Sequence, residues 1–150
     1  MRSFQPVQIL LVEDNPDDVE ITTRALTKSR IANTLHVVRD GQEALDFLLR
    51  EGAYARQQDL CHPDLVLLDL NLPRVNGIQV LDRIRADTAL ARLPVIMLTA
   101  SSREEDIVRS YESGANTFIQ KPVEFDKFVH ALEVIGEYWL LIAKLPPKAA

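Results

Sequence analysis

The sequence is poor in several features that would point to particular classes of protein. It has one cysteine, Cys61, so no disulfide can form within the chain. Cys61 and His62, like the distant His36 and His130, lack the spacing of a metal site and are read as ordinary residues. No apolar run approaches the roughly 20 residues needed to span a bilayer, and Met1 to Gln8 lacks a signal-peptide pattern. We therefore expect a cytoplasmic protein without membrane contact.

An excess of basic residues is also missing. Lys and Arg number 17 against 22 Asp and Glu, for a net charge of -5, and no basic stripe is visible. This balance argues against binding to nucleic acid. A length of 150 residues with 47% hydrophobic content suits one domain, and a DNA-binding output domain would need roughly 60 more residues. We expect a single domain over 1–150, with its core at about 7–139 and an extension at about 140–150.

Short apolar runs alternate with amphipathic stretches along the chain, as in α/β proteins with a parallel sheet covered on both faces. Helix N-caps are predicted at Asn15, before Pro16, and at Asn76. Asp40 with Glu43 and Ser102 with Glu105 have the spacing of capping boxes. The pattern predicts a (βα)5 fold, with strands at Gln8–Val12, Leu35–Val38, Leu65–Leu68, Pro94–Leu98 and Thr117–Ile119.

Two segments depart from this regular pattern. Glu51 to Pro63 is long and polar, and it predicts a surface loop. The last helix, predicted from about Glu124 to Lys144, carries two apolar stripes. One stripe comprises Phe125, Phe128, Leu132, Ile135, Trp139 and Ile142, and the other Val134, Tyr138, Leu141 and Leu145. One small core cannot cover both stripes, so the second predicts a homodimer interface. The alternative is that the tail folds back on its own domain or frays after Trp139.

Acidic and other polar residues directly follow four of the predicted strands. Glu13 and Asp14 follow the first, Asp69 the third, Thr99 the fourth and Lys121 the fifth. Ligands of an open parallel sheet bind at the carboxyl ends of its strands, where these residues would converge. Clustered carboxylates need a proton or a cation to offset their repulsion, and hard oxygen ligands suit Mg²⁺ or Mn²⁺.

The same residues suggest a chemistry for the site. Asp69 is a carboxylate of the kind that forms aspartyl phosphates, Lys121 could neutralise a transferred phosphoryl oxygen, and Thr99 offers a hydroxyl. The bland alternative is that Glu13 and Asp14 form an acidic loop and Asp69 sits in a turn. Taken singly, each residue fits that alternative about as well as it fits a functional site. The combination favours the functional reading.

Four sequence segments, in order and spacing, resemble the receiver domains of response regulators. They are Leu10-Leu11-Val12-Glu13-Asp14-Asn15, Asp64-Leu65-Val66-Leu67-Leu68-Asp69-Leu70-Asn71-Leu72-Pro73, Leu98-Thr99-Ala100 and Lys121-Pro122. The resemblance extends from about Val7 to past Trp139. It implies a doubly wound, flavodoxin-like sheet with strand order 2-1-3-4-5 and a C-terminal helix that is here extended.

The resemblance also implies a role for each matching residue. It makes Asp69 the phosphoacceptor, and it assigns the metal to Glu13, Asp14, Asp69 and the backbone carbonyl of Asn71, with Glu13 binding directly or through water. Lys121 would pair with the phosphoryl group. Its peptide bond to Pro122 would be cis.

The resemblance further implies a conformational switch formed by Thr99, Ala100 and Phe118. Phenylalanine at this position departs from the tyrosine of many receivers. A hydroxyl hydrogen bond therefore cannot belong to this switch.

A closer resemblance concerns the partner. The Asp-Leu-Asn-Leu-Pro segment that starts at Asp69, the polar loop before it, the Ser110–Asn116 stretch and the Tyr138-Trp139-Leu140 ending are similar to the small regulators paired with bacterial phytochrome kinases. The expected partner is therefore a sensor histidine kinase of the phytochrome type. The expected role is a phosphoacceptor signalling domain that assists its own phosphorylation and dephosphorylation, not an enzyme with an external substrate.

Two rival functions are compatible with an aspartate at a strand end. A phosphohydrolase of the haloacid dehalogenase type needs a second acid two residues after its nucleophile, but Asn71 is an amide and cannot serve as a general acid or base. A pseudo-receiver would bind partners without phosphorylation. The intact set of Asp69, Asp14 and Lys121 argues against that reading.

Overall fold

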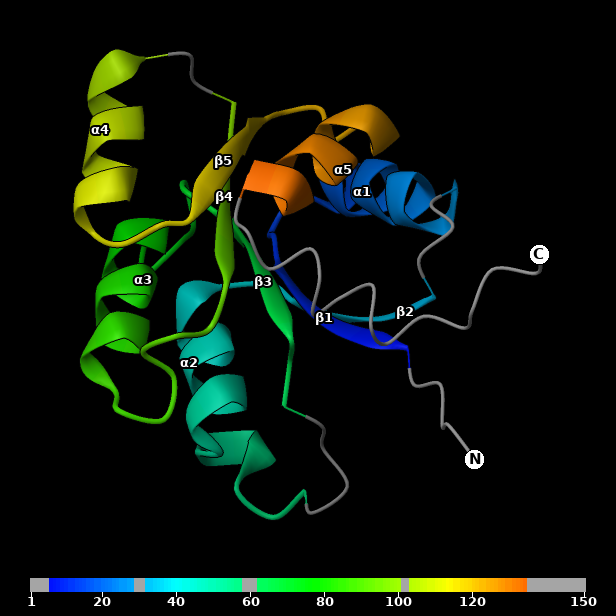
Figure 1. The fold of residues 1–150 in the computed structure, drawn as a ribbon. Helices are drawn as coiled ribbons and strands as arrows, with labels where there is room; N and C mark the ends of the chain where they lie inside the picture. The colour runs from blue at the N-terminus through cyan, green and yellow to red at the C-terminus, as the bar shows by residue number, and fades with distance from the viewer. Residues whose placement is uncertain (1–5, 29–31, 58–61, 101–102, 135–150) are drawn as a thin grey trace.

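The computed structural model describes residues 6–28, 32–57, 62–100 and 103–134, in which strands and helices alternate along the chain (Figure 1). The strands are β1 (Val7–Val12), β2 (Asn33–Val38), β3 (Leu65–Asp69), β4 (Val95–Thr99) and β5 (Thr117–Gln120). The helices are α1 (Pro16–Lys28), α2 (Gly41–Leu49), α3 (Gly77–Ala86), α4 (Glu104–Glu112) and α5 (Phe125–Val134), with a short 3-10 turn, η1, at Gly52–Tyr54.

All five strands run parallel in one sheet with the order β2-β1-β3-β4-β5, which confirms the predicted fold (Figure 1). The register pairs Val12 of β1 with Leu68 of β3, and Asp69 of β3 with Leu98 of β4. The carboxyl ends of these three central strands therefore reach the same edge of the sheet.

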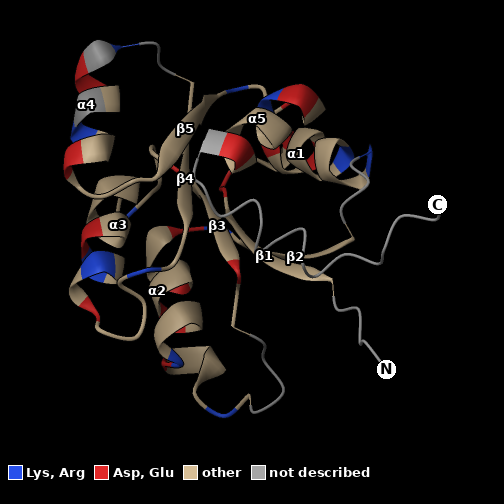
Figure 2. Ribbon diagram, in the orientation of Figure 1, with Lys and Arg blue, Asp and Glu red and all other residues tan. Residues whose placement is uncertain are grey.

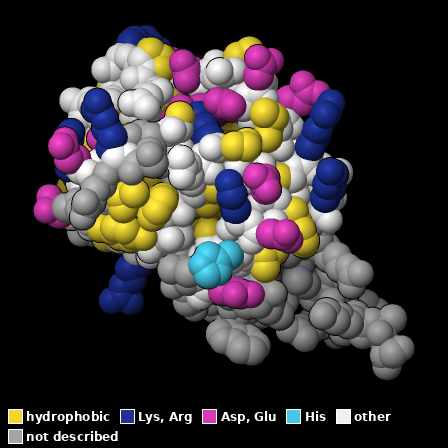
Figure 3. Space-filling model, turned by 90° about the horizontal axis from the view of Figure 1, so that it is seen from above, with side chains coloured by type: hydrophobic (Ala, Val, Ile, Leu, Met, Phe, Trp, Pro, Cys, Tyr) yellow, Lys and Arg dark blue, Asp and Glu magenta, His cyan; other side chains and the backbone are white. Residues whose placement is uncertain are grey.

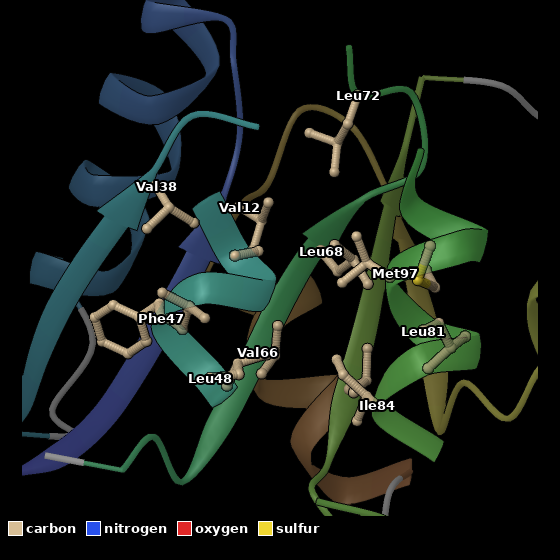
Figure 4. Close-up of a cluster of buried hydrophobic side chains, with 14 of the residues drawn as sticks. Val12, Val38, Phe47, Leu48, Val66, Leu68, Leu72, Leu81, Ile84 and Met97 are labelled. Atoms are coloured by element: carbon tan, nitrogen blue, oxygen red, sulfur yellow. The ribbon is translucent and has the colours of Figure 1, made fainter. Parts of the chain in front are cut away.

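Helices cover the sheet on both faces, and alternate strand residues point to opposite sides. Leu10 and Val12 belong to one buried cluster with Phe47 of α2 and Leu81 of α3 (Figure 4). The intervening residues of β1 belong to a second cluster with residues of α1 and α5. Burial on both faces explains why the strands read as unbroken apolar runs. The charged positions accordingly lie mainly on helices and loops (Figure 2).

Three of the predicted N-cap residues, Asn15, Asp40 and Asn76, cap their helices. The side chain of Asn15 accepts a hydrogen bond from the Asp17 amide at 2.9 Å, ahead of Pro16 at the first helical position. Asn76 forms a full capping box with Gln79.

The two predicted capping boxes, Asp40 with Glu43 and Ser102 with Glu105, are not formed as expected. Asp40 caps α2, but the Glu43 carboxylate accepts from the Arg39 amide instead of from that of Asp40. Ser102 lies outside the described residues, and Arg103 occupies the N-cap position of α4.

The long loop and the last helix are described only in part. The loop contains η1, where Tyr54 packs edge-on against Phe47 with ring centroids 5.1 Å apart. In α5, Phe128 and Leu132 of the first predicted stripe are buried, whereas Phe125, at the start of the helix, is 36% exposed. Ile135, Trp139, Ile142, Tyr138, Leu141 and Leu145 lie outside the described residues, and so does the side chain of Val134. Among the described helices, none is long and apolar enough to cross a membrane.

Gly77, the first residue of α3, lies against the turn that follows β3. Its amide donates to the Leu70 carbonyl at 3.0 Å. A Cβ atom at this position would lie 2.3 Å from the Asp69 carbonyl oxygen and 2.8 Å from Leu70 Cα. Only glycine lets α3 begin so close to the strand end that carries Asp69.

Gly77→Ala should therefore destabilise the domain by about 1–3 kcal/mol, because backbone atoms must move to admit the methyl group. Asp82→Ala, on the exposed side of the same helix, is the control and should change stability by less than about 0.5 kcal/mol. Urea denaturation of both variants measures the difference. If Gly77→Ala were as stable as the wild type, the backbone would be able to admit the methyl group without a loss of stability, and the prediction would be wrong.

Candidate functional site

The polar residues predicted to converge do meet at the carboxyl edge of the sheet. Glu13 follows β1, and its amide donates a hydrogen bond at 3.0 Å to the carbonyl of Val38, the last residue of β2. Asp69 and Thr99 end β3 and β4, and Lys121 follows β5 with its amide bonded to the Thr99 carbonyl at 2.8 Å. In the view from above, charged side chains of both signs lie close together on this face (Figure 3).

Three carboxylates form the centre of the site. One ligand atom from each of Glu13, Asp14 and Asp69 lies within 4.8 Å of the others. Glu13 is fully buried and Asp69 is 3% exposed, whereas Asp14 faces solvent. Like charges this close, with two of them removed from water, repel one another strongly unless a cation or a proton is present.

Lys121 supplies one such cation. Its Nζ donates to Asp69 Oδ2 at 3.1 Å, to Asp18 Oδ2 at 3.0 Å, and to Glu13 Oε1 in a closer ion pair. The Lys121 side chain is only 12% exposed, so these contacts replace most of its hydration. An ammonium has three hydrogens to donate, and each has a carboxylate acceptor here.

Asp18 was not among the predicted site residues. It lies in the first turn of α1, directly after the loop that carries Glu13 and Asp14. The sequence signal was available, because an acidic residue three positions after an N-cap at the carboxyl edge of a sheet lies near that edge. Its contact with Lys121, over 103 residues of sequence, could not be read from the pattern.

Burial shifts the protonation of both partners in the central ion pair. Burial raises the pKa of Glu13 to about 9, and the neighbouring Asp69 carboxylate acts in the same direction and outweighs Lys121. Burial alone would lower the pKa of Lys121, but its contacts with Glu13, Asp69 and Asp18 reverse this effect and raise its pKa. Lys121 thus offsets only part of the effect of burial and of Asp69 on Glu13.

The residues present fit a divalent cation. Glu13 Oε2 is a buried oxygen with no hydrogen-bond partner among the described residues. Glu13, Asp14 and Asp69 offer the hard oxygen ligands that Mg²⁺ and Mn²⁺ prefer, and exposed Asp14 leaves room for water in the coordination shell. A cation in this position would offset the repulsion that otherwise favours a proton on Glu13.

The loop after β3 is held at both ends. The Asn71 amide donates to Asp69 Oδ1 at 3.2 Å, whereas Lys121 donates to the other carboxylate oxygen, Oδ2. Arg74, in a left-handed conformation with φ of 65°, forms an ion pair with Asp40, the N-cap of α2. This pair ties the β3–α3 loop to the neighbouring β2–α2 loop.

The residues predicted to form the switch lie on β4, directly after it, and on β5. Thr99 is buried at the end of β4, and Ala100 beside it is exposed. Phe118 is half-buried on β5, and its ring meets that of Tyr111 on α4 edge-on at 6.2 Å. Tyr111 was not predicted from the sequence. The peptide bond between Lys121 and Pro122 is cis, as the family resemblance implied.

Comparison with known proteins places this geometry in a family. Residues 9–133 match the family model of the response regulator receiver domain. The response regulator Rcp1 of Synechocystis sp. is 37% identical over 144 residues, which cover 96% of each chain.

Solved structures agree with this match. The bacteriophytochrome response regulator AtBRR is 48% identical, with a TM-score of 0.80 over 88% of this chain and 94% of that one. The phosphorylated cyanobacterial phytochrome response regulator RcpA is 40% identical, with a TM-score of 0.76 over 95% and 99%. The Mn²⁺-bound form of Rcp1 has a TM-score of 0.74 over 94% and 99%. The chain belongs to the response regulator receiver family and is homologous to phytochrome response regulators.

Proposed function

We propose that this domain accepts a phosphoryl group on Asp69 from a phosphohistidine of a sensor kinase. The observation that carries the proposal is the setting of Asp69, a buried carboxylate held by Lys121 and the Asn71 amide beside two further acids. In the transfer, a carboxylate oxygen of Asp69 forms a bond to phosphorus as the phosphorus–nitrogen bond of the donor breaks. The freed imidazole nitrogen takes a proton or keeps the lone pair.

The other residues of the site would act through charge and position. The negative charge on the transferring oxygens needs stabilisation, and Lys121 is already within hydrogen-bond distance of the acceptor. Glu13, Asp14, Asp69 and the backbone carbonyl of Asn71 would hold Mg²⁺ or Mn²⁺. That ion would supply electrostatic stabilisation of the phosphoryl oxygens. The Mn²⁺-bound structure of the related Rcp1 supports this choice of metal.

Phosphorylation would be read out through β4, β5 and α4. Thr99 and Ala100 would move toward the phosphoryl group, and Phe118 would repack against Tyr111, which it already contacts. Tyr111 is 45% exposed, so a change in its packing alters the surface that a partner meets. Such a shift between two populations fits the behaviour of phosphorylation switches.

The partner that we propose is a phytochrome-type histidine kinase in the cytoplasm. Support comes from the relatives, because AtBRR and RcpA are both phytochrome response regulators. The domain would assist its own phosphorylation and dephosphorylation without acting on an external substrate. An amide at Asn71 still argues against a phosphohydrolase, and the retained acids and lysine against a pseudo-receiver.

Substitution of the acceptor tests the proposal directly. Asp69→Asn should take up no phosphoryl group from a small acyl phosphate with Mg²⁺, because an amide is a poor nucleophile, whereas the wild type should gain one. Intact-protein mass spectrometry measures the uptake. Asp82→Asn, an exposed change on α3, is the control and should behave like the wild type. Uptake by the Asp69 variant would contradict the assignment.

Mg²⁺ should stabilise the folded domain by mass action. At about 100 times the dissociation constant the gain is about 2.7 kcal/mol, or roughly 5 °C or more in melting temperature. Asp14→Asn should lose most of this shift, because it removes one ligand. An equal ionic strength of NaCl is the control for screening. A melting temperature that Mg²⁺ leaves unchanged would refute the metal site.

We also propose a homodimer through the last helix, in which Val134, Tyr138, Leu141 and Leu145 form the interface. The argument remains that of the sequence, in which two apolar stripes exceed what one core can cover. Replacing Tyr138 and Leu141 with Glu should give a monomer that still accepts phosphate, as measured by sedimentation. A wild type that sediments as a monomer at high micromolar concentration, phosphorylated or not, would exclude the dimer.

A further inference from the structure

The contact between Lys121 and Asp18 has no part in the proposed phosphoryl transfer. Asp18 comes from α1, whereas the acids assigned to the metal follow β1 and β3. Its Oδ2 accepts from Lys121 Nζ at 3.0 Å, and Asp69 Oδ2 accepts from the same nitrogen at 3.1 Å. The two carboxylates thus contact the same ammonium, and their oxygens are no more than about 6 Å apart. This separation is shorter than the Debye length of about 8 Å, so the two charges repel each other with little screening by salt.

All three N–H bonds of Lys121 are directed at carboxylates. The N–H on Asp69 can pass to a phosphoryl oxygen, but a second N–H becomes available only if Glu13 or Asp18 gives it up. Glu13 is fully buried and could not exchange the ammonium for water. The Asp18 side chain is 27% exposed, against 1% for Glu13 and 5% for Asp69. Water can therefore solvate Asp18 after release, which makes this contact the cheapest to break.

We propose that Asp18 is a positioning residue that opposes phosphorylation of Asp69 by holding Lys121 in the unphosphorylated domain. This inference rests on the proposed function. Asp18 acts in two ways of the same sign: it occupies an N–H that a phosphoryl oxygen would use, and its charge repels the negative charge added at Asp69. Asp18 thereby sets how readily the domain responds to a given supply of donor.

The neighbouring residue offers a matched control. Asp17 lies in the same first turn of α1, carries the same charge and is exposed, and the described contacts of Lys121 do not include it. Substituting either acid removes one negative charge near the helix N-terminus, so both variants lose the same favourable interaction with the helix dipole. Only Asp18→Asn weakens the hold on Lys121, because a neutral amide oxygen replaces a charged acceptor of its N–H.

The test uses beryllofluoride, an analogue of the phosphoryl group that binds aspartate without a transfer reaction. With Mg²⁺ present, Asp18→Asn should bind beryllofluoride about fivefold more tightly than the wild type or better, within the usual range of coupling between sites. Asp17→Asn should stay within about twofold of the wild type. Isothermal titration calorimetry gives the affinities, and thermal melts verify that each variant is folded.

A double-substitution cycle tests whether Asp18 acts through Lys121. In a Lys121→Ala background, the gain from Asp18→Asn should fall to about twofold or less, because only the direct charge repulsion between Asp18 and Asp69 then remains. An unreduced effect in that background would overturn the proposal. Equal effects of Asp17→Asn and Asp18→Asn would also overturn it, since they would reflect overall charge alone.

If Asp18→Asn bound beryllofluoride more weakly than the wild type, the inference would be wrong, because Asp18 would then help to orient Lys121 toward the phosphoryl group. These failures differ from failure of the proposed function. If the wild type neither binds beryllofluoride nor gains a phosphoryl group from an acyl phosphate, the proposed function itself is wrong. If the wild type does both and only the difference between variants is missing, Asp18 alone has been misassigned.

Discussion

The ion pairs of one largely buried lysine, Lys121, connect the strands and the helix at the carboxyl edge of the sheet. Lys121 joins β5 to β1, α1 and β3 through carboxylates that would otherwise repel one another. Three acids, Glu13, Asp18 and Asp69, contact this ammonium, and Asp14 lies beside Glu13 and Asp69. Burial raises the pKa of Glu13 to about 9, and the neighbouring Asp69 adds to this shift. The clustered carboxylates fit a divalent cation. In the function that we propose, such a cation would also supply electrostatic stabilisation of a negatively charged phosphoryl group.

The sheet makes this concentration of charge possible. Parallel strands buried on both faces form a rigid apolar platform, and their register brings β1, β3 and β4 to an end at the same edge. Gly77 lets α3 begin within contact of the Asp69 carbonyl, at the end of β3. The favourable free energy of burying apolar side chains in the core thus offsets the electrostatic cost of placing several carboxylates close together at the edge of the sheet.

Much of the fold and the site followed from the sequence, because both depend on short-range patterns. The strands were unbroken apolar runs, and their boundaries were predicted to within one or two residues. Residues directly after strands of a parallel sheet share one edge, which located Glu13, Asp69 and Lys121. The family resemblance added the strand order and the cis bond before Pro122.

Other contacts depend on how the helices pack and could not be read from patterns. Asp18 is an ordinary first-turn acid until α1 is placed beside Lys121. Tyr111 meets Phe118 only because α4 packs on β5. Arg85 of α3 is a further case, because the sequence suggests a surface residue. Its guanidinium donates hydrogen bonds to the carbonyls of Ala91, Leu93 and Gly114, and it thereby connects the loops before β4 and β5.

Localising the phosphoryl group on the chain is the most direct test of the central claim, that the buried acids around Lys121 serve an acyl phosphate at Asp69. The wild-type protein would be phosphorylated with its kinase or with a small acyl phosphate and Mg²⁺, then reduced with borohydride, which converts an aspartyl phosphate to homoserine. Peptide mass spectrometry should find homoserine at position 69 and at no other acid. Reduction at Glu13, Asp14 or Asp18, or no reduction in a protein that retains phosphate, would contradict the account.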